Sequence, residues 1–565
     1  MKRILILLLS LLAVLSAAGC GMISTTTTVT TATTSAPTST TSTLPITGTV
    51  PTSTGTTTTE TTTTTAPTSG STVSTTTAER YQTIELFSMN DVHGGAYYTS
   101  LSYNYDAKAF SKAAALLANK QENEDDVIVL ASGDMFQGTA LSNYYYGRPL
   151  LEVMNYVGFD AFTIGNHEFD WGIDKIAAYA DGNTSNGEAD FPFLAANIVS
   201  VETGEPMPWT RPYAIVDVNG VKVGIIGVIG AVINSISASR VVGYEFLDAA
   251  DTVAEYAEYL RTTEGCRVIV ASIHEYSSAT NNEIANLTGN RKVDAIFNGH
   301  SHTSIASSIV RSGTALPFAQ TSSYPNSLIA KITLVYDRQA GQVSAGAAEI
   351  IGNTGLTQSA EANAILAEYE TEPGYVEFVG EALATAQYAF SSSLLAPWGA
   401  SAIRDYAGVD IGAVNAGGFR VTMEQGTVTM GDMITIYPFD NYIKTCEMTG
   451  AQITAFYESV MEKSDDVVFD DGVGYSYGMG LLTIDGMTVD PDAWYTVGAV
   501  DYIFDKTYYD FLDGRNITTT SFLIRDFLVE DLRNHTTAFN PANGTAFPTP
   551  VAWFPAIRKE DSLLV

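Results

Sequence analysis

Five short runs of apolar residues lie between positions 83 and 297, and each of them stops at a group of polar side chains. The runs are rich in the β-branched and aromatic residues typical of strands, and they cover residues 83–89, 127–131, 161–164, 267–273 and 293–297. Segments with helical character lie between them, and residues 248–260 are one example. This alternation predicts an α/β fold whose functional loops gather at one edge of a sheet, because parallel strands present their carboxyl ends on the same side.

The polar groups that end these runs are rich in side chains that bind metal ions. They read Asn90-Asp91-Val92-His93, Ser132-Gly133-Asp134, Asn166-His167-Glu168-Phe169-Asp170, His274, and Asn298-Gly299-His300-Ser301-His302. Five of the six histidines of the chain fall in these groups, and only His535 lies elsewhere. Any one of them could be a hydrogen-bonded loop histidine, but the whole set indicates a shared site.

Imidazoles, carboxylates and one amide, without thiolates, make a ligand set suited to two divalent metal ions. Two such ions, about 3.5–4 Å apart, generate a hydroxide from water at neutral pH and hold the oxygens of a displacement at phosphorus. Mixed nitrogen and oxygen ligands are compatible with Zn, Mn, Co or Fe, and the sequence does not choose among these metals.

The first 79 residues do not have the composition of a folded domain. Lys2 and Arg3 precede an apolar run with the length of a secretory signal, which leads through small residues to Cys20. This arrangement resembles the cleavage site of a bacterial lipoprotein, so we expect a signal peptide over residues 1–20 and a lipid on Cys20. A plain secretory signal is the alternative. Residues 21–79 are mostly Thr, Ser and Pro, so we expect a disordered stalk and an extracytoplasmic protein, lipid-anchored to the cell membrane or secreted.

The net charge limits the partners of the protein. Twenty-eight Lys and Arg against 62 Asp and Glu give a charge of −34, which repels polyanions, so we do not expect binding to a nucleic acid polymer. A small phosphate substrate would need local positive charge from metal ions and a few arginines. Cys266 and Cys446 are isolated in sequence, so neither a disulfide framework nor a thiolate zinc site is indicated, and their pairing stays open.

Taken together and in order, the polar groups resemble the motif set of the calcineurin-like metallophosphoesterases. The sequence of residues 165–170 is similar to the corresponding motif of the secreted 5′-nucleotidase branch of that family. The resemblance implies a two-sheet αββα sandwich over residues 80–355. It implies that one metal is held by Asp91, His93 and His302, that the other is held by Asn166, His274 and His300, and that Asp134 bridges them. It assigns catalysis to His167, which stabilises charge on the phosphoryl oxygens or assists the leaving group, and to Asp170, which orients His167. Some members carry Gln in place of His302.

The second half of the chain has no comparable metal-binding group. Residues 356–385 have helical character interrupted at Glu372-Pro373-Gly374, which predicts a bent helical connector. In residues 386–565, an apolar run over 413–416 is followed by a glycine turn and Arg420, which is a fair site for an anion, although a purely structural turn is the simpler interpretation of this motif alone.

Residues 386–565 as a whole resemble the smaller C-terminal α/β domain of 5′-nucleotidases, which binds the substrate. The resemblance implies that Arg420 contacts the phosphate or ribose, that Phe439 stacks on the base and that Asn441 bonds to the base. The implied substrate-binding set is Arg404, Asn415, Gly418, Arg420, Phe439, Asn441 and Tyr502. Tyr502 would replace a second stacking Phe, but the usual Gly-Gly-Asp-Gly-Tyr stretch is missing, and Arg404 lacks its usual preceding Asn and Asp.

The sequence therefore predicts a monomeric, surface-anchored hydrolase with two metal ions, which releases phosphate from nucleotides by attack of a metal-bound hydroxide on phosphorus. A 2′,3′-cyclic nucleotide 2′-phosphodiesterase with 3′-nucleotidase activity, or a UDP-sugar hydrolase, is the alternative with the same metal chemistry. A binding lipoprotein without turnover is the alternative from another class of protein.

Overall fold

Two six-stranded sheets form the first half of the protein. The computed structural model describes residues 80–95, 109–321, 328–463, 466–476, 478–506 and 509–546, and the predicted signal peptide, Cys20 and stalk lie outside these ranges. The first sheet has the order β14-β13-β1-β2-β3-β4 and the second the order β11-β12-β10-β9-β7-β6. Their strands are β1 (Tyr81–Met89), β2 (Val127–Ala131), β3 (Ala161–Thr163), β4 (Phe193–Leu194), β6 (Tyr213–Val218), β7 (Val221–Ile229), β9 (Val268–His274), β10 (Ala295–Asn298), β11 (Ile305–Ile309), β12 (Leu316–Gln320), β13 (Ile329–Asp337) and β14 (Gln342–Ile351).

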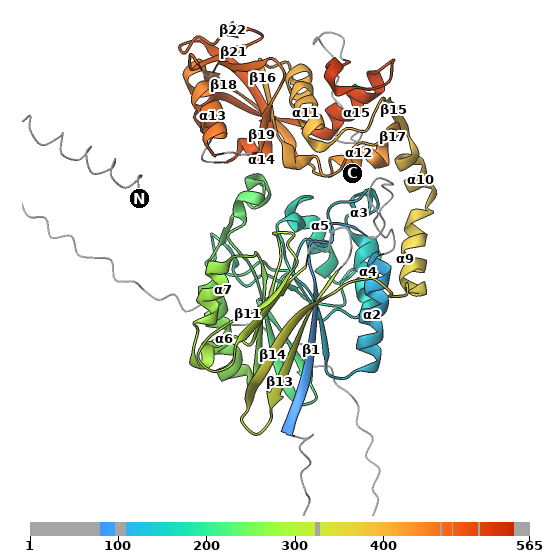
Figure 1. Cartoon of the computed structure of the whole chain (residues 1–565), viewed down its shortest axis with the longest axis vertical. Coiled ribbons are helices and arrows are strands. Elements are labelled where there is room, and N and C mark those ends of the chain that lie inside the picture. The colour runs from blue at the N-terminus through green and yellow to red at the C-terminus, as the bar shows by residue number, and fades with distance from the viewer. Residues whose placement is uncertain are drawn as a thin grey trace, which may run out of the picture. The chain divides into compact units, whose positions relative to one another are not determined.

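Alternating side chains along the strands build a four-layer sandwich. On β1, Leu86 packs into a core between the two sheets, together with Ile225 and Val270 of the second sheet. Its neighbour Phe87 points to the other face, where it packs with Leu117 under the helices of the first layer. These helices are α2 (Ala109–Asn123) and α4 (Arg148–Val157), and α6 (Ala249–Tyr259) and α7 (Ser278–Ala285) cover the outer face of the second sheet (Figure 1). The predicted sandwich fold is confirmed.

The five strands predicted from apolar runs are β1, β2, β3, β9 and β10. Strands β1, β2 and β3 run parallel to one another, and so do β9 and β10, so the polar groups follow carboxyl ends at one edge of each sheet. The predicted helix over residues 248–260 is α6, and it begins where the Asp248 carboxylate accepts a hydrogen bond of 2.8 Å from the backbone N–H of Asp251.

The connector consists of two helices, α9 (Ala360–Glu370) and α10 (Pro373–Gly380). Pro373 occupies the first turn of α10, and the Glu372 carboxylate caps it by accepting from the backbone N–H of Tyr375 at 2.7 Å. Ala362 and Leu366 of α9 are fully buried in the core beneath α2 and α4. The first half of the connector is therefore packed on the first domain.

The second domain is built on a five-stranded sheet in the order β19-β16-β23-β18-β24. Its strands and helices are β15 (Ala382–Ala386), α11 (Ser392–Ala407), β16 (Ile411–Asn415), β17 (Gly426–Thr429), α12 (Met430–Ile436), β18 (Tyr442–Thr449), α13 (Gly450–Lys463), β19 (Val467–Phe469), β20 (Val473–Ser476), β21 (Leu481–Ile484), β22 (Met487–Thr488), β23 (Trp494–Val500), α14 (Asp501–Phe504), β24 (Arg515–Leu523) and α15 (Ile524–Asn534). A further hydrophobic core holds these elements together, and Ala140 of the first domain also packs into it. Cys266 and Cys446 are both buried free thiols, each in a different domain. In the described ranges, no helix is long and apolar enough to cross a membrane.

Candidate metal centre and substrate pocket

Several predicted metal ligands have an unusual backbone conformation. Of the nine non-glycine residues with positive φ in the described ranges, five are predicted ligands: Asp91, His93, Asp134, His300 and His302, with φ between 49° and 74°. This left-handed region is unfavourable for most side chains and persists where surrounding structure enforces it, often at functional sites. The chain thus turns sharply at each strand end, and this turns the side chains toward one centre.

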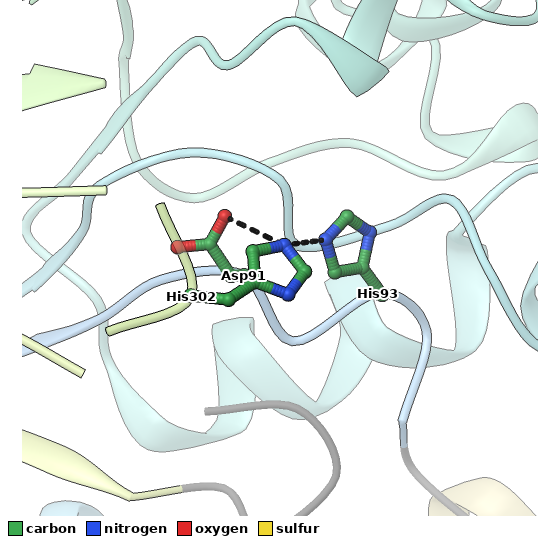
Figure 2. Close-up of side chains that lie close together, drawn as sticks. All are labelled: Asp91, His93 and His302. Atoms are coloured by element: carbon green, nitrogen blue, oxygen red, sulfur yellow. Dashed lines mark hydrogen bonds and ion pairs between the residues drawn. The ribbon is translucent and has the colours of Figure 1, made fainter. Parts of the chain in front are cut away.

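The first ligand group consists of Asp91, His93 and His302, which come from the ends of β1 and β10 (Figure 2). The Nε2 atoms of His93 and His302 are 3.0 Å apart, and His302 Nε2 is 3.5 Å from Asp91 Oδ1. His93 Nδ1 lies 3.1 Å from the backbone carbonyl of Gln137. Because that carbonyl can only accept a hydrogen bond, Nδ1 carries the proton and Nε2 presents a lone pair to the group.

The second ligand group consists of Asp134, Asn166, His274 and His300. Asn166 Oδ1 lies 3.0 Å from His274 Nε2 and 2.8 Å from His300 Nδ1, and Asp134 Oδ2 lies 3.1 Å from His274 Nε2. The proton of His274 is placed on Nδ1 by the backbone carbonyl of Ser132 at 2.8 Å. The atoms that meet here are therefore lone-pair donors, which is the arrangement of a cation site.

The electrostatics of both groups fit divalent metal ions. Burial alone would lower the pKa of His274, but the carboxylates of Asp134 and Asp91 raise it to about 10, so the site favours a positive charge at this point. Burial lowers the pKa of His300 and of His302 to about 4, which keeps both imidazoles neutral and able to bind a metal. The nitrogen and oxygen donors of both groups are of the kinds that bind divalent metal ions.

Asp134 is held at the centre by the neighbouring loop. Its Oδ1 accepts the backbone N–H of His167 at 2.9 Å. Glu168, which is 1% exposed, accepts the N–H groups of Asp134 and Gly165 at 2.9 and 2.8 Å through Oε2, and that of Met135 at 3.0 Å through Oε1. A side chain on Gly165 would have no room, because its Cβ would lie 2.3 Å from Asp134 Oδ1. Glu168 therefore fixes the loops after β2 and β3 to each other.

His167 and Asp170 form a hydrogen-bonded pair beside the metal centre. His167 Nδ1 lies 2.8 Å from Asp170 Oδ2, and His167 Nε2 lies 4.0 Å from Asp134 Oδ2. Burial would lower the pKa of His167, but the Asp170 and Asp134 carboxylates raise it above its ordinary value. The pair thus places an imidazole, able to hold a proton, next to the predicted ligands.

A pocket of about 330 Å³ opens over this centre, and both domains line it. Of the predicted substrate-binding residues, Asn415, Arg420, Phe439, Asn441 and Tyr502 line the pocket. The Phe439 ring is stacked on the His167 ring with centroids 5.4 Å apart, and the Arg420 guanidinium lies 5.7 Å from the centroid of Phe439.

Two predicted residues do not line the pocket. Gly418 is packed under the Tyr437 ring, because a Cβ on Gly418 would lie only 2.5 Å from that ring. Its neighbour Gly417 lines the pocket instead. Arg404 lies on α11 and forms ion pairs with Asp470 at 2.7 Å and Asp405 at 2.8 Å. The guanidinium of Arg404 is therefore committed to these carboxylates. No residue of α11 is among those that line the pocket.

The sequence did not single out several residues that line the pocket: Ser235, Ser237, Arg240, Ser301, Gly417, Asp440 and Asp466. Ser235, Ser237 and Arg240 belong to the loop between β7 and β8 (Tyr244–Phe246), and the run that forms β7 ends without a histidine or carboxylate. The one available signal is the position of this loop, since β7 is parallel to β9 and delivers its loop to the same edge.

Comparison with known proteins agrees with this architecture. Residues 87–304 match the family model for calcineurin-like phosphoesterases, and residues 375–512 match the model for the 5′-nucleotidase C-terminal domain. Endonuclease YhcR of Bacillus subtilis is 28% identical over 470 residues, which cover 76% of this chain and 38% of that protein. The 5′-nucleotidase of Vibrio vulnificus is 23% identical over 439 residues, which cover 69% of this chain and 77% of that protein.

A solved structure shows the same fold over both domains. The 5′-nucleotidase precursor of Thermus thermophilus superposes with a TM-score of 0.66 and 21% identity, covering 80% of this chain and 96% of that one. The two matched models follow each other in this chain as the two sequence resemblances predicted. The chain belongs to the family of metallophosphoesterases that combine a calcineurin-like phosphoesterase domain with a 5′-nucleotidase C-terminal domain.

Proposed function

We propose that this protein is an extracytoplasmic, surface-anchored nucleotidase with two metal ions, which releases phosphate from the 5′ position of nucleotides. The observation that carries the proposal is the meeting of His274 Nε2, His300 Nδ1, Asn166 Oδ1 and Asp134 Oδ2 next to His167, at the base of a pocket lined by both domains. The proposed anchor is the lipid on Cys20, followed by the stalk over residues 21–79.

The proposed ligands are Asp91, His93 and His302 for one ion and Asn166, His274 and His300 for the other, with Asp134 shared. Bound by these residues, two divalent ions would supply a nucleophile from water at neutral pH and would neutralise charge on the phosphoryl oxygens. His167 holds a proton on the pocket side of the centre and stabilises the leaving oxygen, and Asp170 orients the His167 ring through Nδ1.

The proposed division of labour places catalysis in residues 80–355 and substrate selection in residues 386–565, joined by the connector over 356–385. Arg420 carries a guanidinium toward the phosphate or ribose, and Phe439 and Tyr502 offer aromatic faces to the base. Stacking on such faces accepts purines and pyrimidines alike. Asn441 is fixed by its bonds to Tyr437 Oη and to Asp501, at 3.2 and 3.0 Å, so its amide is held in a defined orientation at the wall of the pocket.

The test uses residues 80–565, stripped of metal and then supplied separately with Mn, Zn or Co. The substrates are AMP, 3′-AMP, 2′,3′-cyclic AMP, UDP-glucose, p-nitrophenyl phosphate and a short RNA, and the readout is phosphate or nucleoside release. Metal-dependent release of phosphate from AMP, with the RNA left intact, is the expected result. Activity confined to 2′,3′-cyclic AMP would replace the proposal by the 2′,3′-cyclic nucleotide 2′-phosphodiesterase alternative. Activity confined to UDP-glucose would replace it by the UDP-sugar hydrolase alternative. Two bound metals with no turnover on any substrate would indicate a binding protein.

A further inference from the structure

Four buried hydroxyl groups lie between the two sheets, in the layer directly beneath the proposed metal ligands. They belong to Ser88 of β1, Ser132 directly after β2, Thr163 of β3 and Ser272 of β9. Each of these residues stands two positions after an apolar residue of the core between the sheets, namely Leu86, Leu130, Ala161 and Val270. Because side chains two apart on a strand share a face, the four hydroxyls form the last layer of that core. All four residues are at most 1% exposed, and the function proposed above gives them no role.

These residues, which we call the hydroxyl chain, form one continuous series of hydrogen bonds. Thr163 Oγ1 donates to Ser272 Oγ at 2.7 Å, and Ser272 Oγ lies 2.9 Å from Ser132 Oγ. Ser132 Oγ lies 2.8 Å from Ser88 Oγ, which donates to the carbonyl of Met89 at 3.4 Å. Each hydroxyl has one proton, Thr163 donates at one end and the carbonyl at the other end only accepts. Every bond of the hydroxyl chain therefore has the same direction, from Thr163 to Met89.

The hydroxyl chain joins the two sheets to each other. Ser272 belongs to the second sheet, whereas its two partners, Thr163 and Ser132, come from β3 and the end of β2 in the first sheet. The rest of the core between the sheets is apolar, and apolar packing has no preferred direction. Hydrogen bonds depend on both distance and angle, so the hydroxyl chain fixes one sheet against sliding over the other.

The relative position of the sheets matters because the second ligand group draws on both. Asp134 and Asn166 follow strands of the first sheet, whereas His274 and His300 come from the ends of β9 and β10 in the second. Three members of the hydroxyl chain stand two or three positions before a ligand of this group: Ser132 before Asp134, Thr163 before Asn166 and Ser272 before His274. A shift at the hydroxyl chain would therefore change the distances between the donor atoms of this group.

The first ligand group has a separate link between the sheets. Asn90, which directly precedes Asp91, donates to the carbonyl of Thr321 at 2.9 Å and accepts the N–H of Thr321 at 3.0 Å. Thr321 directly follows β12 of the second sheet. The bonds of this pair include no member of the hydroxyl chain, so the two ligand groups should respond differently when a hydroxyl is removed.

We propose that the hydroxyl chain positions the ligands of the second group, and that Thr163 and Ser272 are its essential members because they form the bonds between the sheets. Both are positioning residues, which act on the bound ion through Asn166 and His274. The inference rests on the proposed metal ligands and names the residues that fix the geometry of one of the two groups.

Thr163 allows the hydroxyl to be tested separately from the packing of the side chain. Thr163→Val replaces the hydroxyl by a methyl group of similar size, whereas Thr163→Ser keeps the hydroxyl and removes the methyl group. Thr263→Val is the matched control, because Thr263 is exposed in the helical segment Leu260–Glu264 that follows α6. The experiment measures the number of bound ions by elemental analysis and the affinity for each by competition with a chelator, in the full-length protein loaded with Mn.

The expected result is a selective loss at one of the two ions. Removing a hydrogen bond that supports metal ligands weakens metal binding, so Thr163→Val should bind one ion roughly 10–100-fold more weakly and keep the affinity for the other. Thr163→Ser and Thr263→Val should bind both ions as the wild type does. Ser272→Ala removes both bonds between the sheets and should show the same selective loss, so it supplies the result if Thr163→Val does not fold.

Three outcomes would overturn the inference. Wild-type affinity for both ions in Thr163→Val and Ser272→Ala would show that the hydroxyls do not position the ligands. Equal losses in Thr163→Val and Thr163→Ser would assign the effect to packing of the methyl group. Weakening of both ions by the same factor would indicate a general loss of stability, which the melting temperature of the metal-free variants measures.

Failure of the proposed function has a different signature. A wild type that binds two ions but releases no phosphate from AMP would reject the nucleotidase activity, while a selective loss in Thr163→Val would still support the hydroxyl chain. A wild type that binds no metal would reject both the proposed ligands and this inference.

Discussion

Five residues at the strand ends are proposed metal ligands and also have a strained backbone conformation. Asp91, His93, Asp134, His300 and His302 all adopt positive φ, which ordinary residues avoid because Cβ approaches the following carbonyl. The residue types and their order were sufficient to predict that these five side chains lie close together, since few structural turns require imidazoles and carboxylates together. Their backbone conformation could not be predicted, because it depends on contacts such as those that hold the loop of Asp134 to Glu168.

His167 provides the most direct residue-scale test of catalysis. We expect His167→Ala to lower kcat roughly 10²–10⁴-fold, as for loss of a group that donates a proton or stabilises charge. Both metals should stay bound, because the two proposed ligand sets do not include this ring. Elemental analysis and steady-state kinetics check the two statements separately, and Asp170→Asn should lose less activity because it only orients the ring. Unchanged turnover in His167→Ala would remove it from the mechanism.

Phe439 tests substrate selection at the same scale. The ring is stacked on His167 and lies beside Arg420, so it joins the second domain to the catalytic pair. If its face binds the base, Phe439→Ala should raise KM for AMP by roughly 5–100-fold, the loss of one stacking contact. KM for p-nitrophenyl phosphate, which has no base or ribose, is the internal control and should change far less. Equal changes for the two substrates would mean that Phe439 acts only through His167.

At the scale of elements, Glu168 connects the loops that follow β2 and β3. Burial and the nearby Asp134 charge raise the pKa of Glu168 to about 7, while three backbone N–H groups bind its two oxygens. Gln has one oxygen and a donor in place of the other, so Glu168→Gln leaves at least one buried N–H without an acceptor. We expect a loss of about 1–3 kcal/mol in the free energy of unfolding and weaker metal binding.

Denaturant unfolding and metal titration measure these two effects. Glu283→Gln, on the exposed side of α7, is the matched control and should change neither. Stability and metal affinity equal to those of the wild type in Glu168→Gln would show that the carboxylate does not fix the two loops.

The sequence predicted several strands of the first domain but not the contribution of the loop after β7. Strands β2, β3, β9 and β10 and the second half of β1 lie in apolar runs that are buried on both faces, a pattern that local sequence reveals. The contribution of the loop after β7 did not follow, because Ser235, Ser237 and Arg240 have no motif and reach the pocket only through the parallel pairing of β7 with β9. Arg404 shows the opposite case. Its position in the sequence matched a family pattern, but Asp470 and Asp405 hold its guanidinium outside the pocket.

At the scale of the whole molecule, contacts between the domains surround Phe439. Asn143 of α3 (Ala140–Tyr144) donates from Nδ2 to the carbonyl of Pro438 at 2.7 Å and accepts the N–H of Gly138 through Oδ1 at 2.9 Å. The buried Arg525 binds the same segment from the second domain, through the carbonyls of Tyr437 and Phe439 at 3.0 and 3.2 Å. The pocket therefore depends on both domains, whereas the metal ligands come from the first alone.

This separation predicts the behaviour of the first domain in isolation. Ala362 and Leu366 of α9 complete its core, whereas α10 contacts α12 of the second domain, so the fragment should contain residues 80–371. We expect it to fold, to bind two metal ions per chain and to hydrolyse p-nitrophenyl phosphate. It should show no preference for AMP over this substrate, because Arg420, Phe439 and Asn441 are missing. A second fragment, residues 80–355, lacks α9 and should be less stable by about 2–5 kcal/mol for each large buried side chain removed. Retention of the AMP preference in the fragment over 80–371 would place substrate selection in the first domain and contradict the proposed division of labour.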